Sequence, residues 1–310
     1  MKLSHKKIVV TGGGGFLGKY VVQRLKKEGA SDIFSPLSKE YDLRNREVCR
    51  KIVKNADIVI HLAAQIGGIG FIGEHMGEVF YNNIVMGVEL MEASRLAGVE
   101  KFVSVGTVCE YPKSPPVPFR EEDLWEGYPE ETTSSYGWAK KVLIVQGKAY
   151  KKQYNFNAIH LLPVNLYGPH DNFDRTSSHV IPALVKRVIE AKEKKKPYVK
   201  IWGTGTATRE FLYVQDAAEG IVLATKKYDS TEPVNLGTGV ETFIKDLVKI
   251  IAELTGYHGE IKWDATKPDG QPRRRLDVSK AKKEFGFSAK TSLKKGLRAT
   301  IEWYQRYRTI

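Results

Sequence analysis

The chain has 310 residues, of which 42% are hydrophobic and 27% charged, a composition typical of a globular protein that can bury a core without disulfides or metals. It carries 49 Lys and Arg against 36 Asp and Glu, a formal net charge of +13, so anionic partners must be weighed. We expect neither a membrane span nor a signal peptide, because no stretch reaches roughly 18 apolar residues and no apolar h-region follows the N-terminus.

Part of the positive charge is local, in the lysine-rich segment 192–196 and in Arg273, Arg274 and Arg275. Three interpretations stay open: a solvated helix end, which we favour for 192–196, a nucleic-acid surface, or a site for a small polyanion such as a dinucleotide or sugar diphosphate. Because no RNP, KH or zinc-finger pattern is present, we expect no nucleic-acid partner.

The first 105 residues alternate between short apolar runs and helical patterns. Strands are predicted at 7–11, 32–35, 56–62 and 101–105, and helices at 16–27, 45–55 and 82–97. Alternation at this spacing predicts an α/β protein with a Rossmann-type, doubly wound parallel sheet covered on both faces. Burial on both faces explains why the strands are continuously apolar.

The later chain is less regular. We expect strands at 158–162, 211–214 and 234–236, helices at 180–195 and 216–225, and a site-forming loop at 163–178, where Pro, Gly, Asn and Asp gather. From residue 244 onward the pattern is mostly helical and basic. We therefore predict that residues 1–163 and 212–238 form the sheet domain, and that 164–211 and 239–310 form a smaller, mostly helical lobe.

A glycine turn joins the first strand to the first helix. Gly12 permits the tight turn, Gly15 lets a pyrophosphate approach the backbone, and Gly18 packs helix on strand. The free N–H groups of the helix then face the phosphates. The alternative is a glycine-rich turn without a ligand, but the strand–turn–helix context favours a dinucleotide site in the sheet domain.

The segment after the second strand bears on the choice of cofactor. Residues 35–39 hold neither the acid that binds ribose hydroxyls in NAD-specific folds nor an arginine for a 2′-phosphate. Ser38 or Lys39 is our candidate for that phosphate, and Asp42 with Leu43 is expected to flank the adenine.

Tyr136 and Lys140 form a Y-x-x-x-K pair. Residues four apart share one face of a helix, so Lys140 is expected to lie near the phenol and lower its pKa. Tyr136 would then exchange a proton at neutral pH. An ordinary half-exposed helix pair is the alternative, which the upstream glycine turn and Thr107 at a strand end disfavour.

Motifs along almost the whole chain resemble those of the extended short-chain dehydrogenase/reductases, most closely the GDP-L-fucose synthases, which are GDP-4-keto-6-deoxymannose 3,5-epimerase/4-reductases. HLAA at 61–64 and YGWAK at 136–140 are shared by many sugar-nucleotide epimerases, whereas Cys109 with SHVIPAL at 178–184 is far more specific. The other similar segments are GG at 67–68, GTVCEYP at 106–112, PVNLYGP at 163–169, DNF at 171–173, IWGTG at 201–205, REFL at 209–212, and KPDG at 267–270 with Pro272 and Arg273.

The resemblance implies a role for each catalytic candidate. Thr107 would bind the substrate C4 oxygen, Tyr136 would protonate it with support from Lys140, and Cys109 and His179 would epimerise C3 and C5. Inverting a carbon beside a ketone needs one group to remove a proton and another to return it on the opposite face, and tuned Cys and His suit this task. The alternatives are a small buried hydrophobe for Cys109 and a helix cap for His179.

Binding residues follow from the same resemblance, and no metal is expected. Arg209 suits a diphosphate because guanidinium binds phosphate in a bidentate way, whereas Trp202 either stacks on the base or simply packs. The substrate contacts would be Thr107, Asn165, Arg187, Trp202, Arg209 and Asp269. The contacts of NADP or NAD, with NADPH preferred by resemblance, would be Gly12, Gly15, Phe16, Leu17, Gly18, Ser38, Lys39, Asp42, Leu43, Leu62, Ala63, Ala64, Val105, Tyr136, Lys140, Pro163, Asn165, Leu166 and His179.

Departures from the family keep rivals open. Thr107-Val108-Cys109 replaces the usual Ser-Ser-Cys, Glu110 replaces an apolar residue and adds a possible third titrating group, and the NADP-binding arginine is absent after the second strand. The rivals are a 4,6-dehydratase, disfavoured because its Asp-Glu pair is missing, a 4-epimerase with bound NAD, an enzyme of a related sugar such as a GDP-heptose or a dTDP- or UDP-hexose, and a non-catalytic cofactor-sensing protein.

The cysteines and the helices suggest a setting and a state of assembly. Cys49 and Cys109 lie 60 residues apart without CxxC spacing, which predicts neither a disulfide framework nor a zinc site and fits the reducing cytoplasm. The resemblance implies a homodimer formed through the helices that start near Asn82 and Tyr136.

Overall fold

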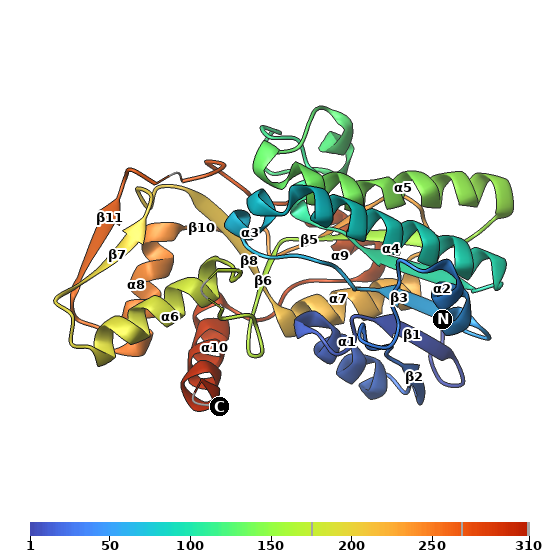
Figure 1. Cartoon of the computed structure of the whole chain (residues 1–310), viewed down its shortest axis with the longest axis horizontal. Coiled ribbons are helices and arrows are strands. Elements are labelled where there is room, and N and C mark those ends of the chain that lie inside the picture. Colours follow the sequence, from blue (N-terminus) through green and yellow to red (C-terminus); the bar gives the residue numbers. More distant parts are fainter. Residues whose placement is uncertain (175, 268, 309–310) are drawn as a thin grey trace.

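The structure, a computed structural model that describes residues 1–174, 176–267 and 269–308, is a helix-covered sheet with a smaller lobe at one end (Figure 1). The sheet has six strands in the order β2-β1-β3-β4-β5-β9, and every neighbouring pair is parallel. The predicted Rossmann-type parallel sheet is therefore confirmed. The strands are β1 (Lys7–Thr11), β2 (Asp32–Phe34), β3 (Ile58–His61), β4 (Lys101–Val105), β5 (Ala158–Pro163) and β9 (Val234–Leu236).

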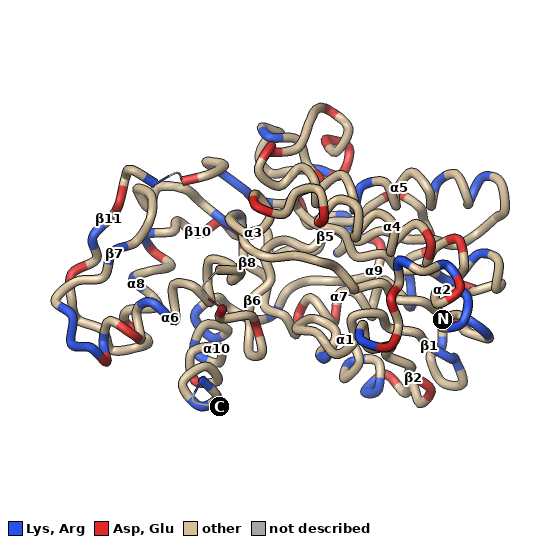
Figure 2. The backbone as a smooth tube through the Cα atoms, viewed as in Figure 1, with Lys and Arg blue, Asp and Glu red and all other residues tan. Residues whose placement is uncertain are grey.

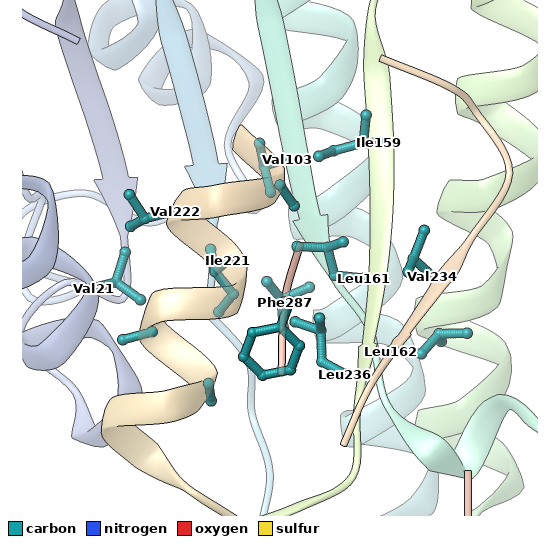
Figure 3. Packing of buried hydrophobic residues seen from close by; sticks show 14 of the residues in the cluster. Val21, Val103, Ile159, Leu161, Leu162, Ile221, Val222, Val234, Leu236 and Phe287 are labelled. Atoms are coloured by element: carbon teal, nitrogen blue, oxygen red, sulfur yellow. The ribbon is translucent and has the colours of Figure 1, made fainter. Parts of the chain in front are cut away.

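Helices cover both faces of this sheet (Figure 1). One layer holds α2 (Arg46–Val53), α4 (Met76–Leu96) and α5 (Ser134–Tyr154), and the other holds α1 (Phe16–Lys27) and α7 (Val214–Lys227). Figure 3 shows how α7 packs: Ile221 faces the side of the central strands that carry Val103 and Leu161, and Val222 lies beside Val21 of α1. Because both faces are buried in this way, the strands read as continuous apolar runs.

The order of the strands creates a crevice for a ligand. β1 lies between β2 and β3, so the chain leaves β1 in one direction and returns on its other side. Open α/β sheets bind ligands at such a switch point, outside the carboxyl ends of the strands. Here these ends are tied together, because Thr11 Oγ1 lies 2.9 Å from the buried ring nitrogen Nδ1 of His61.

The smaller lobe contains two further sheets and three helices that share a second apolar core. The strand order is β10-β8-β6 in one sheet and β11-β7 in the other. The elements are β6 (Asn165–Tyr167), β7 (Tyr198–Trp202), β8 (Thr208–Tyr213), β10 (Glu241–Phe243), β11 (Glu260–Asp264), α6 (Val180–Glu193), α8 (Ile244–Thr255) and α10 (Leu293–Tyr307).

Several of these strands were not anticipated. β6 lies inside the expected loop 163–178, β7 lies in a stretch for which no element was predicted, and β11 lies in the region from 244 onward that was expected to be mostly helical. In β7 only Val199 and Ile201 face inward, and the lysine-rich segment before it obscures this short alternation. The remaining elements are α3 (Ile69–Glu74), α9 (Ser279–Phe285) and three 3-10 helices, η1 (Val108–Glu110), η2 (Glu121–Trp125) and η3 (Glu131–Thr133).

The two parts are closely interleaved. α9 packs against α7 and β9, and its Phe285, with Phe287, joins the core beneath the large sheet. The domain division at 163, 212 and 238 stays a prediction. Lys and Arg are spread over both parts, with a basic run beyond α6 (Figure 2), and the exposure of residues 192–196 fits a solvated helix end. Within the described residues, no helix has the length and apolar character needed to cross a membrane.

Candidate active site

A cleft of about 1450 Å³ opens at the carboxyl end of the large sheet and continues along the lobe. Its walls include Gly12 and Ala63 from the sheet side and Ile201 and Arg209 from the lobe. Every site residue proposed from the sequence lines this cleft, except Lys39. The chain thus brings together residues that are up to 257 positions apart, Gly12 to Asp269.

The glycine turn forms a cradle that side chains would fill. A Cβ on Gly12, whose φ is +71°, would lie 2.8 Å from the backbone nitrogen of Ala63. A Cβ on Gly18 would lie 2.0 Å from the Gly12 carbonyl oxygen, so α1 packs directly on the turn. Gly15 is the N-cap of α1 and leaves the N–H groups of that helix open to the cleft. These features fit the pyrophosphate of a dinucleotide.

The part of the cleft where the sequence predicted the adenosine contains an arginine that the sequence did not suggest. Ser38, Asp42 and Arg44 line it, whereas Lys39 does not. The Arg44 guanidinium donates hydrogen bonds of 2.7 to 3.1 Å to both carboxylate oxygens of Asp42, and one of 3.1 Å to the side-chain oxygen of Asn82. These bonds lower the pKa of Asp42 to about 2. A cation therefore lines this part of the cleft, although the segment 35–39 itself holds no arginine.

Tyr136 and Lys140 lie buried at the start of α5. Lys140 Nζ is 6.0 Å from the centroid of the Tyr136 ring and 3.4 Å from the carbonyl oxygen of Ala63. Burial lowers the pKa of Lys140 to about 8, against the opposing effect of the Glu110 charge. The expectation that Lys140 lowers the Tyr136 pKa is wrong here, because burial, together with Cys109 and Glu110, raises it well above 10.

The turn after β4 holds Thr107 and Cys109 beside that tyrosine. Thr107 caps η1, and its Oγ1 accepts the N–H of Cys109 at 3.2 Å. The half-buried Cys109 side chain packs against the small apolar cluster that contains Tyr136. Glu110 is fully buried and does not line the cleft, so it is not the third titrating group at the substrate that the sequence suggested.

His179 enters the cleft from the lobe, as the N-cap residue of α6. Contacts with Gly68, on the opposite wall of the cleft, fix the two residues before His179. The N–H of Gly68 donates to the carbonyl oxygen of Ser177 at 2.9 Å, and a Cβ on Gly68 would lie 2.7 Å from the carbonyl oxygen of Ser178. The His179 side chain is exposed to the cleft, while the surrounding chain desolvates the ring and lowers its pKa. An imidazole that is neutral at neutral pH can accept a proton.

Arg209 is a half-buried cation whose hydrogen bonds, among the described residues, all go to carbonyl oxygens. Its guanidinium donates to the carbonyl oxygens of Thr208, Gln271 and Asp269, at 2.7, 2.6 and 3.1 Å. Burial, together with Arg274, lowers its pKa to about 10. A positive charge so placed in a cleft is well suited to an anionic group of a ligand.

The far end of the cleft suits an aromatic base. Trp202 is 61% exposed, although large apolar side chains are usually covered. Arg187 and Lys267 lie over its ring at 5.7 Å each. Asp269 is held by Thr204, which donates its N–H at 2.8 Å and its hydroxyl at 2.6 Å. Of the motif 267–270, Pro268 lies outside the described residues.

The remaining predicted residues also line the cleft. Asn165 donates its side-chain amide to the carbonyl of Glu210 at 2.9 Å, which leaves its amide oxygen free of a described partner. Residues missed from the sequence include Gln65, Glu130, Thr132, Thr133 and Arg274. The two threonines directly precede the Ser134-Ser135-Tyr136 segment, and Arg274 belongs to the arginine run 273–275. Their closeness in the chain to predicted site residues or to this basic run could therefore have identified all three.

Known proteins with the same sequence features decide the family. The NAD dependent epimerase/dehydratase family matches residues 8–237. The GDP-L-fucose synthase of Sinorhizobium fredii is 39% identical over 97% of this chain and 96% of its own. This chain belongs to the NAD dependent epimerase/dehydratase family. It is an NAD(P)-dependent enzyme with a Rossmann-type fold, as the motifs at 12–18 and 136–140 predicted.

Solved structures of the family are similar over the whole length. A C. jejuni GDP-6-OMe-4-keto-L-xylo-heptose reductase superposes with a TM-score of 0.91 at 28% identity, covering 99% of both chains. A GDP-L-fucose synthetase from Naegleria fowleri bound to NADP gives 0.89 at 28%, covering 99% of this chain and 96% of the other. The cofactor and epimerase/reductase class expected from the motifs are thereby confirmed.

Proposed function

We propose that this enzyme converts GDP-4-keto-6-deoxymannose to GDP-L-fucose, as an NADPH-dependent 3,5-epimerase/4-reductase. The observation that carries the proposal is that Cys109 and His179 line the same cleft as Tyr136 and Lys140. A ketone reductase needs only the last two, whereas epimerisation also needs acid/base groups that act on two faces of the sugar.

The residues divide the reaction into two parts. Of Cys109 and His179, one removes the proton from a carbon beside the ketone and the other returns a proton to its opposite face, at C3 and then at C5. Thr107 holds the C4 oxygen, and Tyr136 delivers a proton to it. The nicotinamide, when bound, supplies the hydride for C4. Lys140 supports the tyrosine, and Arg209 binds the diphosphate while Trp202 receives the guanine.

We further propose a preference for NADPH over NADH. Arg44 is the cationic side chain among the described residues that line the adenosine end of the cleft. Its three hydrogen bonds to the Asp42 carboxylate hold it there, and a guanidinium binds phosphate strongly. Residues 35–39, directly after β2, hold no acid to select for ribose hydroxyls, and the Asp42 carboxylate that follows them is already bonded to Arg44.

The proposed setting is a cytoplasmic homodimer. α4 and α5 pack side by side, and Phe80, Tyr81 and Val145 leave 41%, 60% and 51% of their area exposed. Aromatic side chains of this kind are common at protein interfaces. Both cysteines are free thiols, and the chemistry proposed for Cys109 needs a reducing environment. Light scattering of the purified protein tests the dimer.

A 4-reductase of a GDP-heptose is the second candidate, supported by the TM-score of 0.91 to the C. jejuni heptose reductase. The deciding experiment supplies the purified enzyme with NADPH and, in separate reactions, GDP-4-keto-6-deoxymannose or a GDP-4-keto-heptose. We expect faster NADPH oxidation with the deoxyhexose and GDP-L-fucose as product. Oxidation with the heptose alone would replace the proposal by its rival.

The same preparation tests the possibility of an internal-redox 4-epimerase. Mass spectrometry identifies nucleotides released when the purified enzyme is denatured. We expect no retained NAD(H), because a reductase must exchange its cofactor in each turnover. Stoichiometric NAD(H) in the released fraction would favour the 4-epimerase.

A further inference from the structure

A buried carboxylate lies directly behind the catalytic turn. Glu110, the last residue of η1, has no exposed area and does not line the cleft. Taking a carboxylate out of water is costly unless donors replace its hydration. Its partners therefore show what the residue is built to hold.

Two donors meet this carboxylate from different elements. The N–H of Thr107 lies 2.8 Å from Glu110 Oε1, and His160 Nε2 on β5 lies 3.1 Å from both oxygens. Because a carboxylate only accepts, we assign the Nε2 proton to His160. On its other side the ring meets the hydroxyl of Ser104, with Nδ1 at 2.7 Å from Oγ. The assembly thus links two neighbouring strands to the turn.

The backbone is shaped to admit this pair. Ser104 and His160 are direct partners in the parallel register of β4 and β5, so the ring is held at the strand that ends in the catalytic turn. Gly106 lies between strand and turn, and a Cβ there would be 2.0 Å from Glu110 Oε1 and 2.2 Å from His160 Nε2. Any side chain at 106 would displace the pair.

We infer that Glu110 is a positioning residue, which anchors the backbone of Thr107 to His160 and so holds the Thr107 hydroxyl and the Cys109 thiol against the substrate. The inference rests on the proposed function, because it concerns where those two groups meet a sugar. The anchor acts on Thr107, the N-cap residue of η1, whose Oγ1 in turn accepts the N–H of Cys109 and fixes it. A small displacement of Thr107 and Cys109 should lower the rate of the reaction strongly, because catalysis depends on the orientation of the reacting groups.

The charge of Glu110 has a second effect, on the catalytic helix. It raises the pKa of Lys140, against burial, and so favours the ammonium form. Removing the charge while keeping the shape should therefore let Lys140 deprotonate at lower pH. The titratable groups facing Glu110 are Cys109 and Tyr111 on its own turn, Tyr136, Lys140 and Lys141 on α5, and His160 on β5.

Three variants separate anchor from charge. Glu110→Ala removes both the hydrogen bond to Thr107 and the negative charge. Glu110→Gln removes only the charge, because its amide oxygen can still accept the Thr107 N–H. Glu121→Gln is the matched control, because Glu121 also accepts a backbone N–H, that of Asn235 at 2.9 Å, but lies outside the cleft. Amide hydrogen exchange of the segment 106–110 reports the anchor without any substrate. Steady-state kinetics with GDP-4-keto-6-deoxymannose and NADPH report its effect on catalysis.

In Glu110→Ala we expect Thr107 amide exchange to accelerate about tenfold or more, and kcat to fall by a similar factor with little change in KM. Glu110→Gln should keep near-normal exchange, but the alkaline limb of its rate profile should move to lower pH. Glu121→Gln should match the wild type in all three measurements.

A folded Glu110→Ala with unchanged exchange and kcat would overturn the inference. Should that variant not fold, Glu110→Asp decides, because its shorter side chain cannot reach both the Thr107 N–H and His160, and unchanged Thr107 exchange in it overturns the inference. If the wild-type enzyme oxidises no NADPH, the proposed function is wrong. The anchor is then still tested without substrate, because unchanged Thr107 exchange in Glu110→Ala would reject it.

Discussion

Gly137 and Cys109 touch through their backbones, so closely that a Cβ on Gly137 would lie 2.2 Å from the Cys109 carbonyl oxygen. This approach seats the first turn of α5, and with it Tyr136, on the turn that carries Thr107 and Cys109. The glycine after the tyrosine is therefore what brings the proton donor of the reduction next to the candidate base of the epimerisation.

Gly137→Ala should separate these groups. We expect the free energy of unfolding to fall by about 2 kcal/mol, as is usual when a methyl group is forced into a packed site. Activity should fall further than stability explains, because Tyr136 moves relative to Thr107. The control is Gly73→Ala in α3, where a Cβ meets nothing within 4 Å. Chemical denaturation measures the free energy of unfolding, and NADPH oxidation measures the activity. A fully active Gly137→Ala would contradict the close packing.

Arg209→Met should weaken binding of the nucleotide sugar. Hydrogen bonds to charged groups contribute about 1.5–3 kcal/mol, so KM should rise roughly 10- to 100-fold, with a smaller loss in kcat. Arg120→Met is the control, since Arg120 pairs with acids at the surface and does not line the cleft. An unchanged KM in Arg209→Met would show that the diphosphate binds elsewhere.

The reduction should slow above about pH 8, where Lys140 loses its proton. This loss is not unfolding. The folded-state pKa lies below the ordinary 10.5, so between about 8 and 10.5 the unfolded chain binds more protons at this site, and the contribution of Lys140 to stability rises with pH. A rate profile and thermal melts over the same pH range test this, and Lys140→Met should lack the limb near pH 8.

Arg44→Ala should reduce the preference for NADPH. Loss of an exposed guanidinium–phosphate contact weakens binding by about 1 kcal/mol, so the kcat/KM ratio of NADPH to NADH should fall roughly fivefold. Lys39→Ala, at the position first suspected from the sequence but outside the cleft, should leave the ratio unchanged. A ratio that falls in Lys39→Ala and stays unchanged in Arg44→Ala would instead assign the 2′-phosphate to Lys39.

Local rules explain why much of the site was predictable. The spacing of Gly12, Gly15 and Gly18 reflects a positive φ and two close approaches, which few other residues tolerate. Tyr136 and Lys140 share a helix face through the period of the α-helix alone. The large sheet follows equally from alternating apolar runs, because strands buried on both faces need continuous hydrophobicity.

The rest depends on contacts between distant segments. Arg44 reaches the cleft only because the irregular segment after β2 folds back toward Asn82 on α4. Glu110 and His160 are 50 residues apart, and their meeting requires the register of β4 with β5. β7 pairs with β11, whose sequence lies about 60 residues further on, so neither strand could be recognised from its own short pattern.

The central claim, that Cys109 and His179 epimerise the sugar before it is reduced, is tested most directly by running the reaction in D₂O. Mass spectrometry and NMR of the product then locate the deuterium. We predict deuterium at both C3 and C5 with the wild type, and its incorporation slowed at least about 100-fold in Cys109→Ser and in His179→Gln. A wild-type product that is reduced at C4 but carries hydrogen at C3 and C5 would contradict the account.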